Sequence, residues 1–193
     1  MERSASAGEP EAELARLIQV GEHREALRLC AEQYAASVGR LCMALLGSQA
    51  EAEDTTQEIL LEAHAGFAGW RAEGSFKAWL FAIARRRCAK ALERRGRREQ
   101  RLRLVQPPPP HEHAEDWVIR QERAVRARSA IAEIRPSLRE ALVLRYGAEL
   151  SFKEVGDACG IEEVAARKRV SRALARLREA MSDGEALSGS ERE

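Results

Sequence analysis

The amino-acid sequence predicts an all-α protein made of two small helical domains joined by an extended linker. Ala, Leu, Glu and Arg, which favour helices, dominate the chain. No stretch shows the sustained alternation of β-branched residues that predicts strands. Four consecutive prolines at 107–110 can only be extended, and they separate a longer helical part from a shorter one. We therefore divide the chain into a first domain, a linker, a second domain and a disordered tail, at residues 11–104, 105–120, 121–182 and 183–193.

Composition and charge limit the class of protein. The 193 residues are 45% hydrophobic and 33% charged, with a net charge of +1, which is typical of a soluble folded chain. No apolar run approaches the roughly 18–20 residues that span a bilayer, and the N-terminal segment lacks the apolar core of a signal peptide. We therefore expect a cytoplasmic protein without membrane insertion. The four cysteines form no CxxC pair and are expected to be reduced and buried, with a thiol sensor as the alternative.

Charge is distributed unevenly along the chain. Residues 85–103 carry ten Arg or Lys against two Glu, and residues 164–178 carry six against no acidic residue. Unbalanced arginines repel one another unless an anion compensates them, so two such clusters on otherwise acidic segments indicate a polyanionic ligand. The alternative is a pair of solvated helix faces.

The first domain begins with helical sequence near Glu11. A second helical segment, from near Glu22 to Gly47, has apolar residues at intervals of three or four. Ser48 then opens an acidic helix in which one face combines polar groups with an apolar anchor. That face holds Asp54, Gln57, Glu58 and Leu61. Such a face suits docking on a basic helical partner, and a solvated stripe is the alternative.

The next segment joins aromatic and basic residues. Five of the nine aromatic residues of the chain lie within residues 67–81. Most of them fit the apolar stripe of a helix that includes Phe76. Trp70 and Trp79 stand beside the arginine-rich run, and aromatic rings next to a basic track hold unpaired bases by stacking, worth about 1–3 kcal/mol per base. This segment is therefore a candidate site for single-stranded nucleic acid.

The second domain has the pattern of a helix-turn-helix. An arginine-rich helix is expected over residues 122–134, and Pro136 interrupts it and starts another. Ser151 and Glu154 predict a capping box on a short helix that ends at Gly160, after which a last helix follows. The outer side of this last helix carries Arg167, Lys168, Ser171 and Arg172. A basic outer side is what a major-groove reader requires, although an ordinary helical hairpin is the alternative.

Four segments carry a family resemblance. They are AEDTTQEILLEAH and FKAWLFAIARRRC in the first half, and IRPSLREALVLRYGAELSFKEVGDACGI and RKRVSRALARLR in the second. In this order and spacing, over residues 25–105 and 121–180, they resemble the extracytoplasmic-function (ECF), or group IV, sigma factors of bacterial RNA polymerase. The resemblance implies that the first domain is a sigma region 2 helical bundle and the second a sigma region 4 helix-turn-helix.

The resemblance also implies a function. Such a subunit binds core RNA polymerase, at the clamp of β′ and the flap of β, and directs transcription initiation through the −10 and −35 promoter elements. An anti-sigma factor becomes a candidate partner, and the linker would run through the RNA exit path.

The family assigns roles to three sets of residues. The residues expected to contact the β′ clamp are Asp54, Gln57, Glu58 and Leu61. The residues expected to capture and melt the −10 element are Trp70, Arg71, Ser75, Trp79, Arg86, Arg87, Lys90 and Arg94. The residues expected to bind the −35 element are Arg167, Lys168, Arg169, Ser171, Arg172 and Arg176.

The sequence departs from the family pattern in two places. The family commonly has IARN followed by an Asp four residues later, whereas this chain has Arg86 and Lys90. The pocket for a flipped base is therefore expected to have a different preference or to rely more on phosphate contacts. Recognition helices of the family commonly begin with a Gly/Asn-Thr-Val-Lys-like run, whereas this chain has Val164, Ala165 and Ala166 before its basic residues. Loss of the Thr hydroxyl removes a phosphate contact, so weaker −35 binding is expected.

The sequence offers no Ser/His/Asp arrangement, phosphate-cradling glycine loop or metal cluster, so we expect neither an enzyme nor a cofactor or metal site. His111 and His113 in the proline-rich segment are expected to be solvated. Two other functions stay open: a sigma-like decoy that binds an anti-sigma factor without driving transcription, and a helix-turn-helix regulator that acts without polymerase. The docking helix and both basic clusters argue against the decoy, and the regulator leaves the first domain unexplained.

Overall fold

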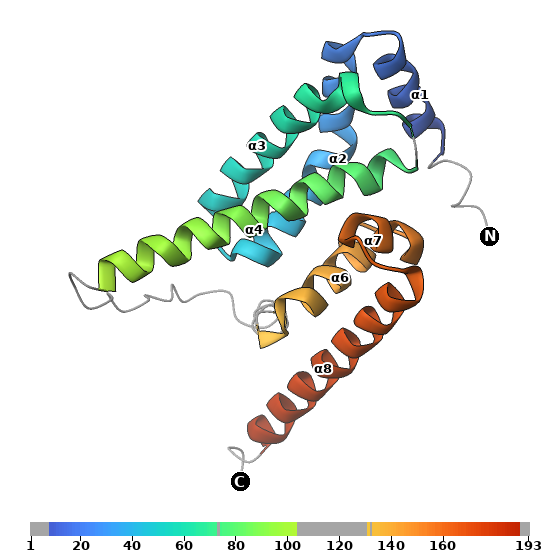
Figure 1. Ribbon diagram of the computed structural model, residues 1–193. Helices are drawn as coiled ribbons and strands as arrows, with labels where there is room; N and C mark the ends of the chain where they lie inside the picture. Colours follow the sequence, from blue (N-terminus) through green and yellow to red (C-terminus); the bar gives the residue numbers. More distant parts are fainter. Residues whose placement is uncertain (1–7, 73, 104–130, 132, 190–193) are drawn as a thin grey trace.

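The computed structural model describes residues 8–72, 74–103, 131 and 133–189. Within these ranges it consists of α-helices, one 3-10 helix and loops, with no strand, which confirms the all-α prediction (Figure 1). In chain order the elements are α1 (Gly8–Gln19), α2 (His23–Leu46), α3 (Gln49–Gly66), η1 (Phe67–Gly69), α4 (Phe76–Arg103), α6 (Pro136–Tyr146), α7 (Phe152–Cys159) and α8 (Glu163–Gly189).

Glycine and serine set the boundaries of the first helices. The turn between α1 and α2 passes through Gly21 at a φ of 83°, a conformation that favours glycine. α2 ends where Gly47 adopts a φ of 73° and its N–H donates to the carbonyl of Met43. The Ser48 side chain then accepts a hydrogen bond from the N–H of Glu51, which confirms that α3 opens at this serine. The short turn makes α2 and α3 neighbours in the bundle.

The first half of the chain is a helical bundle. Leu41 of α2, Ile59 of α3 and Leu80 of α4 are fully buried and belong to one cluster. Phe67 and Phe76 are also fully buried, so the structural role predicted for most of the aromatic residues is confirmed for these two. The apolar stripe of α4 thus fixes which of its faces is left for the basic residues.

The second half contains the predicted helix-turn-helix, formed by α7 and α8. Ser151 accepts a hydrogen bond from the N–H of Glu154, and the Glu154 carboxylate accepts one from the N–H of Ser151, so the capping box is confirmed. α7 ends at Gly160, whose φ of 66° is left-handed. A Cβ at Gly156 would lie 2.7 Å from the carbonyl oxygen of Ile161, so glycine lets α7 approach the turn.

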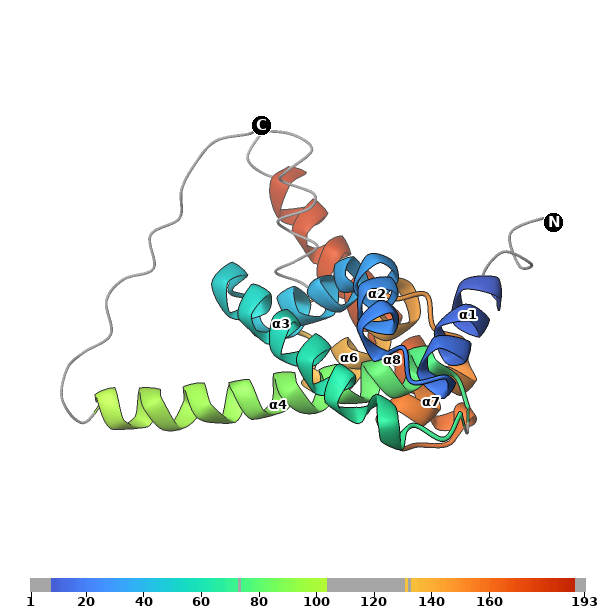
Figure 2. The same cartoon turned by 90° about the horizontal axis from the view of Figure 1, so that it is seen from above.

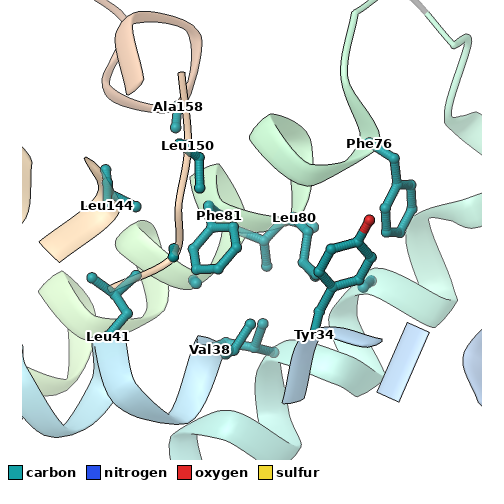
Figure 3. Close-up of a cluster of buried hydrophobic side chains, with 14 of the residues drawn as sticks. Tyr34, Val38, Leu41, Phe76, Leu80, Phe81, Leu144, Leu150 and Ala158 are labelled. Atoms are coloured by element: carbon teal, nitrogen blue, oxygen red, sulfur yellow. The ribbon is translucent and has the colours of Figure 1, made fainter. Parts of the chain in front are cut away.

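The two halves share one hydrophobic core. α6 and α7 lie beside α2 and α4 (Figures 1 and 2). The cluster in Figure 3 takes Leu41, Leu80 and Phe81 from the first half and Leu144 and Leu150 from the second, all fully buried. The sequence predicts two helical domains, and the structure packs them into one body because apolar side chains of α6 and of the loop after it face α2 and α4.

The ends of the predicted domains are described only in part. The tail predicted to be disordered at 183–193 is instead helical as far as Gly189. Ala186 and Leu187 favour helix, and the helix continues through Gly184 although glycine costs about 1 kcal/mol there relative to alanine. The linker predicted at 105–120 lies outside the described residues, as does most of the helix predicted at 122–134.

Candidate nucleic-acid interface

α3 presents the predicted acidic face to solvent. Asp54 and Gln57 are exposed, and Glu58 is partly covered. Leu61 is 64% exposed although its side chain is apolar. A single exposed apolar side chain is common on protein surfaces, so Leu61 points to a docking surface only together with the polar residues predicted on the same face.

Carboxylates of α3 neutralise arginines of α4. Arg87 forms ion pairs with Glu62 and with Glu58, the second at 3.3 Å between Nη1 and Oε2. Arg94 lies 3.8 Å from the same Glu58, and Arg86 lies 3.6 Å from Glu62. Two carboxylates of α3 thus compensate part of the charge of these three arginines, so the need for a polyanion is smaller here than the charge count of the segment indicates.

Two of the predicted residue sets meet in a groove between α3 and α4. The groove is lined by Glu51, Asp54, Thr55, Glu58, Ala91, Arg94 and Arg95. Asp54 and Glu58 come from the predicted polymerase face, and Arg94 comes from the −10 set. A partner docked on α3 would therefore alter the electrostatic surroundings of Arg94, since Glu58 pairs with it.

Trp70 and Trp79 are half-buried in an aromatic cluster. The centroid of each indole lies 5.3 Å from the ring of Phe76, and the Trp70 ring meets it edge-on at 86°. Gly66 admits the Trp79 ring, because a Cβ there would lie 3.0 Å from Cζ2. Both indoles keep an accessible portion while their buried portions hold them in place, which is how a stacking surface is preorganised.

The remaining residues of the −10 set differ in how accessible they are. Arg71 and Lys90 are exposed. The Ser75 hydroxyl instead lies 2.7 Å from Oε1 of Glu154 and 3.0 Å from Oε1 of Glu11. Burial opposes ionisation of Glu154, but the hydrogen bonds that its carboxylate accepts outweigh burial and keep its pKa below the usual value. Ser75 is thus held between two carboxylates in this arrangement of the chain.

α8 exposes the predicted basic face. Lys168, Ser171 and Arg172 are exposed, whereas Ala166 and Val170 on the opposite side are buried. No ion pair of Lys168 or Arg172 is found within the described part of the chain. The division into a core side and an outer side that the sequence predicts for this helix is confirmed.

The other two arginines of the −35 set lie differently on the helix. Arg169 is partly buried. Arg176 is exposed and pairs with Glu179 at 3.0 Å, one turn further along α8.

Two neighbours hold Arg167 in place. Its guanidinium carbon lies 4.4 Å from the centroid of the Phe152 ring, and its Nη2 lies 2.8 Å from Oε1 of Glu163. Phe152 belongs to α7, so the first helix of the motif positions a residue of the second. The sequence patterns do not single out Phe152 or Glu62. Both are visible in the sequence only as ordinary helical residues, and no local pattern indicates which side chain each one contacts.

The rest of the described chain adds no further chemistry to this site. All four cysteines are buried, as predicted. Within the described ranges, no three His, Cys, Asp or Glu side chains lie close enough together to hold a metal ion. Among the same residues, no helix has both the length and the apolar character needed to cross a bilayer.

Comparison with known proteins identifies both halves of the chain. The family profile for sigma-70 region 2 matches residues 30–98, and the profile for sigma-70 region 4 matches residues 130–179. The ECF RNA polymerase sigma factor SigC of Mycobacterium tuberculosis is 31% identical over 134 residues, which cover 68% of this chain and 70% of SigC. SigG of the same species is 30% identical over 160 residues, covering 70% of this chain but 43% of SigG, so the chain spans less than half the length of that relative.

A solved structure has a similar architecture. The sigma factor RpoE of Bartonella quintana, crystallised with the anti-sigma factor NepR, is 25% identical with a TM-score of 0.64, and the match covers 79% of this chain and 94% of RpoE. The resemblance inferred from the sequence motifs is thus confirmed by profiles for both regions and by relatives that span them. This chain belongs to the family of ECF RNA polymerase sigma factors.

Proposed function

We propose that the chain is a sigma subunit that binds core RNA polymerase and directs transcription initiation through the −10 and −35 elements. One observation carries the proposal: a single chain with both sigma regions exposes an acidic face on α3 and a basic face on α8. The protein acts by binding and not as an enzyme, in the cytoplasm where polymerase and promoters lie. A regulator of the anti-sigma class, with which RpoE was crystallised, is a further proposed partner.

Residues 11–104 form the polymerase-binding and −10-binding domain in this proposal. The β′ clamp docks on the α3 face of Asp54, Gln57, Glu58 and Leu61. Leu61 supplies the apolar anchor, because an exposed apolar side chain gains most when a partner removes it from water. The carboxylates around it attract a basic partner and fix its register.

The −10 element is bound along α4 and the loop before it. Trp70 and Trp79 offer accessible indole surface for unpaired bases, and Arg71 and Lys90 offer exposed cations for the backbone. Ser75, Arg86, Arg87 and Arg94 make the remaining contacts with the −10 element. Because Arg87 is paired with Glu62, its contact with DNA requires a phosphate to replace a carboxylate.

Residues 121–182 form the −35-binding domain, which also contacts the β flap. Arg167, Lys168 and Ser171 lie near the start of α8 and face the base edges in the major groove. Arg169, Arg172 and Arg176 contact phosphates or the flank of the helix. The ring of Phe152 under Arg167 supports this division, because a fixed guanidinium can approach a guanine edge in one orientation.

The first test is binding to bacterial core RNA polymerase followed by run-off transcription from the DNA upstream of the chain's own gene. We expect co-elution with core polymerase and a discrete transcript. Co-elution without any transcript on a panel of promoters would instead favour the decoy, and DNA binding without co-elution would favour the regulator. Asp54→Arg should weaken the affinity for core polymerase and leave DNA binding unchanged. Glu25→Arg, the same charge change at an exposed position of α2, is the matched control.

The second test separates base contacts from phosphate contacts on α8. Lys168→Ala should lower the affinity for the cognate −35 duplex more than for a scrambled duplex. Arg176→Ala should lower both affinities by a similar factor. Equal losses on both duplexes from both variants would refute base recognition by Lys168.

A further inference from the structure

An exposed valine lies at the start of the basic outer side of α8. Val164 is the second residue of this helix, and it is 63% exposed. Ala166, two positions further along, is fully buried, so the two side chains lie on opposite sides of α8. The apolar side chain of Val164 is therefore not part of the protein core.

Val164 shares one face of α8 with two residues proposed to meet the base edges. Lys168 and Ser171 follow it at intervals of four and three residues, the spacing of neighbours on one helix face, and both are exposed. Arg167 and Arg172 are exposed on the two sides of this row. α6 and α7 pack against the opposite side of the helix (Figure 1). The exposed face thus begins with an apolar side chain and continues with polar and charged ones.

The charges on this face fit duplex DNA better than an apolar protein surface. Residues 164–178 carry six Arg or Lys and no acidic residue. The phosphates of DNA compensate such a row, whereas an apolar partner would leave the cations desolvated and unpaired. Glu163, the acidic residue next to Val164, is paired with Arg167 at 2.8 Å, so part of its charge is already neutralised. We therefore take duplex DNA as the partner of this face.

Thymine is the base that presents a methyl group in the major groove. The other base edges present hydrogen-bond donors and acceptors there. Val164 has no polar side-chain atom, so it would leave those donors and acceptors without partners, whereas contact with a methyl group removes apolar surface from water on both sides. The chemistry of the row therefore favours a thymine opposite Val164.

The spacing along the helix restricts where this thymine lies. Val164 and Lys168 are four residues apart, which is about 6 Å along the axis at about 1.5 Å per residue. Base pairs follow one another at about 3.4 Å. The thymine is therefore expected within about two base pairs of the base pair that Lys168 contacts.

We propose that Val164 is a specificity-determining residue that contacts the C5-methyl group of a thymine in the −35 element. The inference rests on the proposed sigma function, because that function places α8 in the major groove. Val164 belongs to the run in which this chain departs from the family pattern, so family membership does not assign this contact. The exposed valine thus adds base recognition where the missing hydroxyl removes a phosphate contact.

Removal of a single methyl group tests the contact. The assay measures binding of the full-length chain, in complex with core polymerase, to the promoter DNA that gives the run-off transcript. Each thymine of the −35 element is replaced in turn by 2′-deoxyuridine, which lacks only the methyl group. For the wild type, one of these replacements should lower the affinity by about fourfold, the value for one buried methyl group.

The same measurement on Val164→Ala shows whether the methyl effect belongs to this residue. The variant should bind the unmodified promoter more weakly by a similar factor and should show no further loss with deoxyuridine at the sensitive position, because both changes remove one contact. Alanine favours helix more than valine does, so α8 should remain folded, which circular dichroism checks. Val20→Ala is the matched control, since Val20 is 59% exposed but follows α1 in the first half. It should change neither the affinity nor the methyl effect.

Three results would overturn the contact while leaving the sigma function intact. They are a complex that binds and transcribes but has no sensitive thymine, a methyl effect that persists in Val164→Ala, and a sensitive thymine more than about two base pairs from the pair that Lys168→Ala no longer distinguishes. A chain that neither binds core polymerase nor yields a transcript would instead refute the sigma function, and the methyl contact with it.

Discussion

α4 and α8 are both arginine-rich helices, but the protein neutralises their charges in different ways. Four arginines of α4 (Arg86, Arg87, Arg94 and Arg95) pair with carboxylates of the neighbouring helix α3, whereas the ion pairs of α8 found among the described residues lie within α8 itself. Lys168 and Arg172 of α8 have no ion-pair partner among the described residues. Similar compositions thus give one helix on which several arginines are paired across a helix contact and one on which Lys168 and Arg172 face solvent without an ion pair. The number of basic residues in a segment sets the upper limit on the anions it can bind. The packing decides how many of those cations stay unpaired and accessible.

Burial adds to the difference between these helices. The side chains of Arg87 and Glu62 are 31% and 32% exposed, whereas those of Arg167 and Glu163 are 59% and 48% exposed. An ion pair at a packed helix interface holds its geometry and is screened less than one on an exposed helix face. The α3–α4 pairs therefore stabilise the bundle, and the α8 pairs mainly orient single side chains.

The largest effect should come from removing a carboxylate at the α3–α4 contact. Glu62→Ala leaves Arg87 half-buried beside fewer anions, and we expect the free energy of unfolding to fall by about 1–2 kcal/mol. Glu163→Ala on α8 is the matched control and should change it by less than about 0.5 kcal/mol. Urea denaturation followed by circular dichroism measures both. Equal losses for the two variants would show that the two helices do not differ in this respect.

The salt dependence of DNA binding should show the same contrast. Arg172→Ala should reduce the slope of log affinity against log salt on a −35 duplex by about 0.9, the value for one lost phosphate contact. Arg87→Ala should reduce the slope on single-stranded −10 DNA by clearly less than the corresponding value of about 0.7, because Glu62 already neutralises Arg87. Fluorescence anisotropy between 50 and about 300 mM salt is sufficient for this comparison. A full-sized change for Arg87→Ala would mean that DNA displaces the carboxylate completely.

A smaller effect is expected when the ring under Arg167 is replaced. Phe152→Leu keeps an apolar side chain but removes the cation–π contacts of this ring with Arg167 and Arg145, so the affinity for the cognate −35 duplex should fall by roughly two- to fivefold. Tyr146→Leu removes an exposed ring that lies over Arg145 and should leave −35 affinity unchanged. Binding to a scrambled duplex tests whether Phe152 positions Arg167 for base contact or supports DNA binding in general. A positioning role predicts little loss of affinity for the scrambled duplex.

The smallest effect concerns the place where α4 and α7 meet. The folded-state pKa of Glu154 lies below its usual value, so its contribution to stability is complete above the unfolded-state pKa and is lost as the pH falls through the lower folded-state pKa. Below about pH 4.5, the free energy of unfolding should therefore fall slightly more for the wild type than for Ser75→Ala, which lacks one hydrogen bond to this carboxylate. Identical pH profiles would show that Ser75 does not contribute to the shift.

Local sequence patterns predicted much of the fold because they depend on contacts within a few residues. Ser151 and Glu154 are three positions apart, and their capping box follows from that spacing alone. Gly47 and Gly160 end helices because their left-handed conformations favour glycine. The outer side of α8 was predicted from helical periodicity in the same way. The tail is the exception, since its polar terminal sequence indicated disorder where helix formation continues to Gly189.

Contacts between distant segments could not be predicted in this way. Nothing near Arg87 in the sequence indicates Glu62, and nothing near Arg167 indicates Phe152, because each partner lies on another helix. The expected need for a polyanion around residues 85–103 overlooked these carboxylates. A count of charges along one segment contains no information on what packs beside it.

The sequence by itself determined the helical class, the helix boundaries at Gly47, Ser48, Ser151 and Gly160, the two sigma regions and the residues that α3 and α8 expose. These depend on backbone propensity, capping and periodicity, which act over one or two helical turns. Only the tertiary structure decided which arginines are neutralised and that α6 and α7 pack on α2 and α4. Those outcomes depend on which apolar faces bury one another and on the charges that the packing then brings together, so they follow from the relative placement of whole helices.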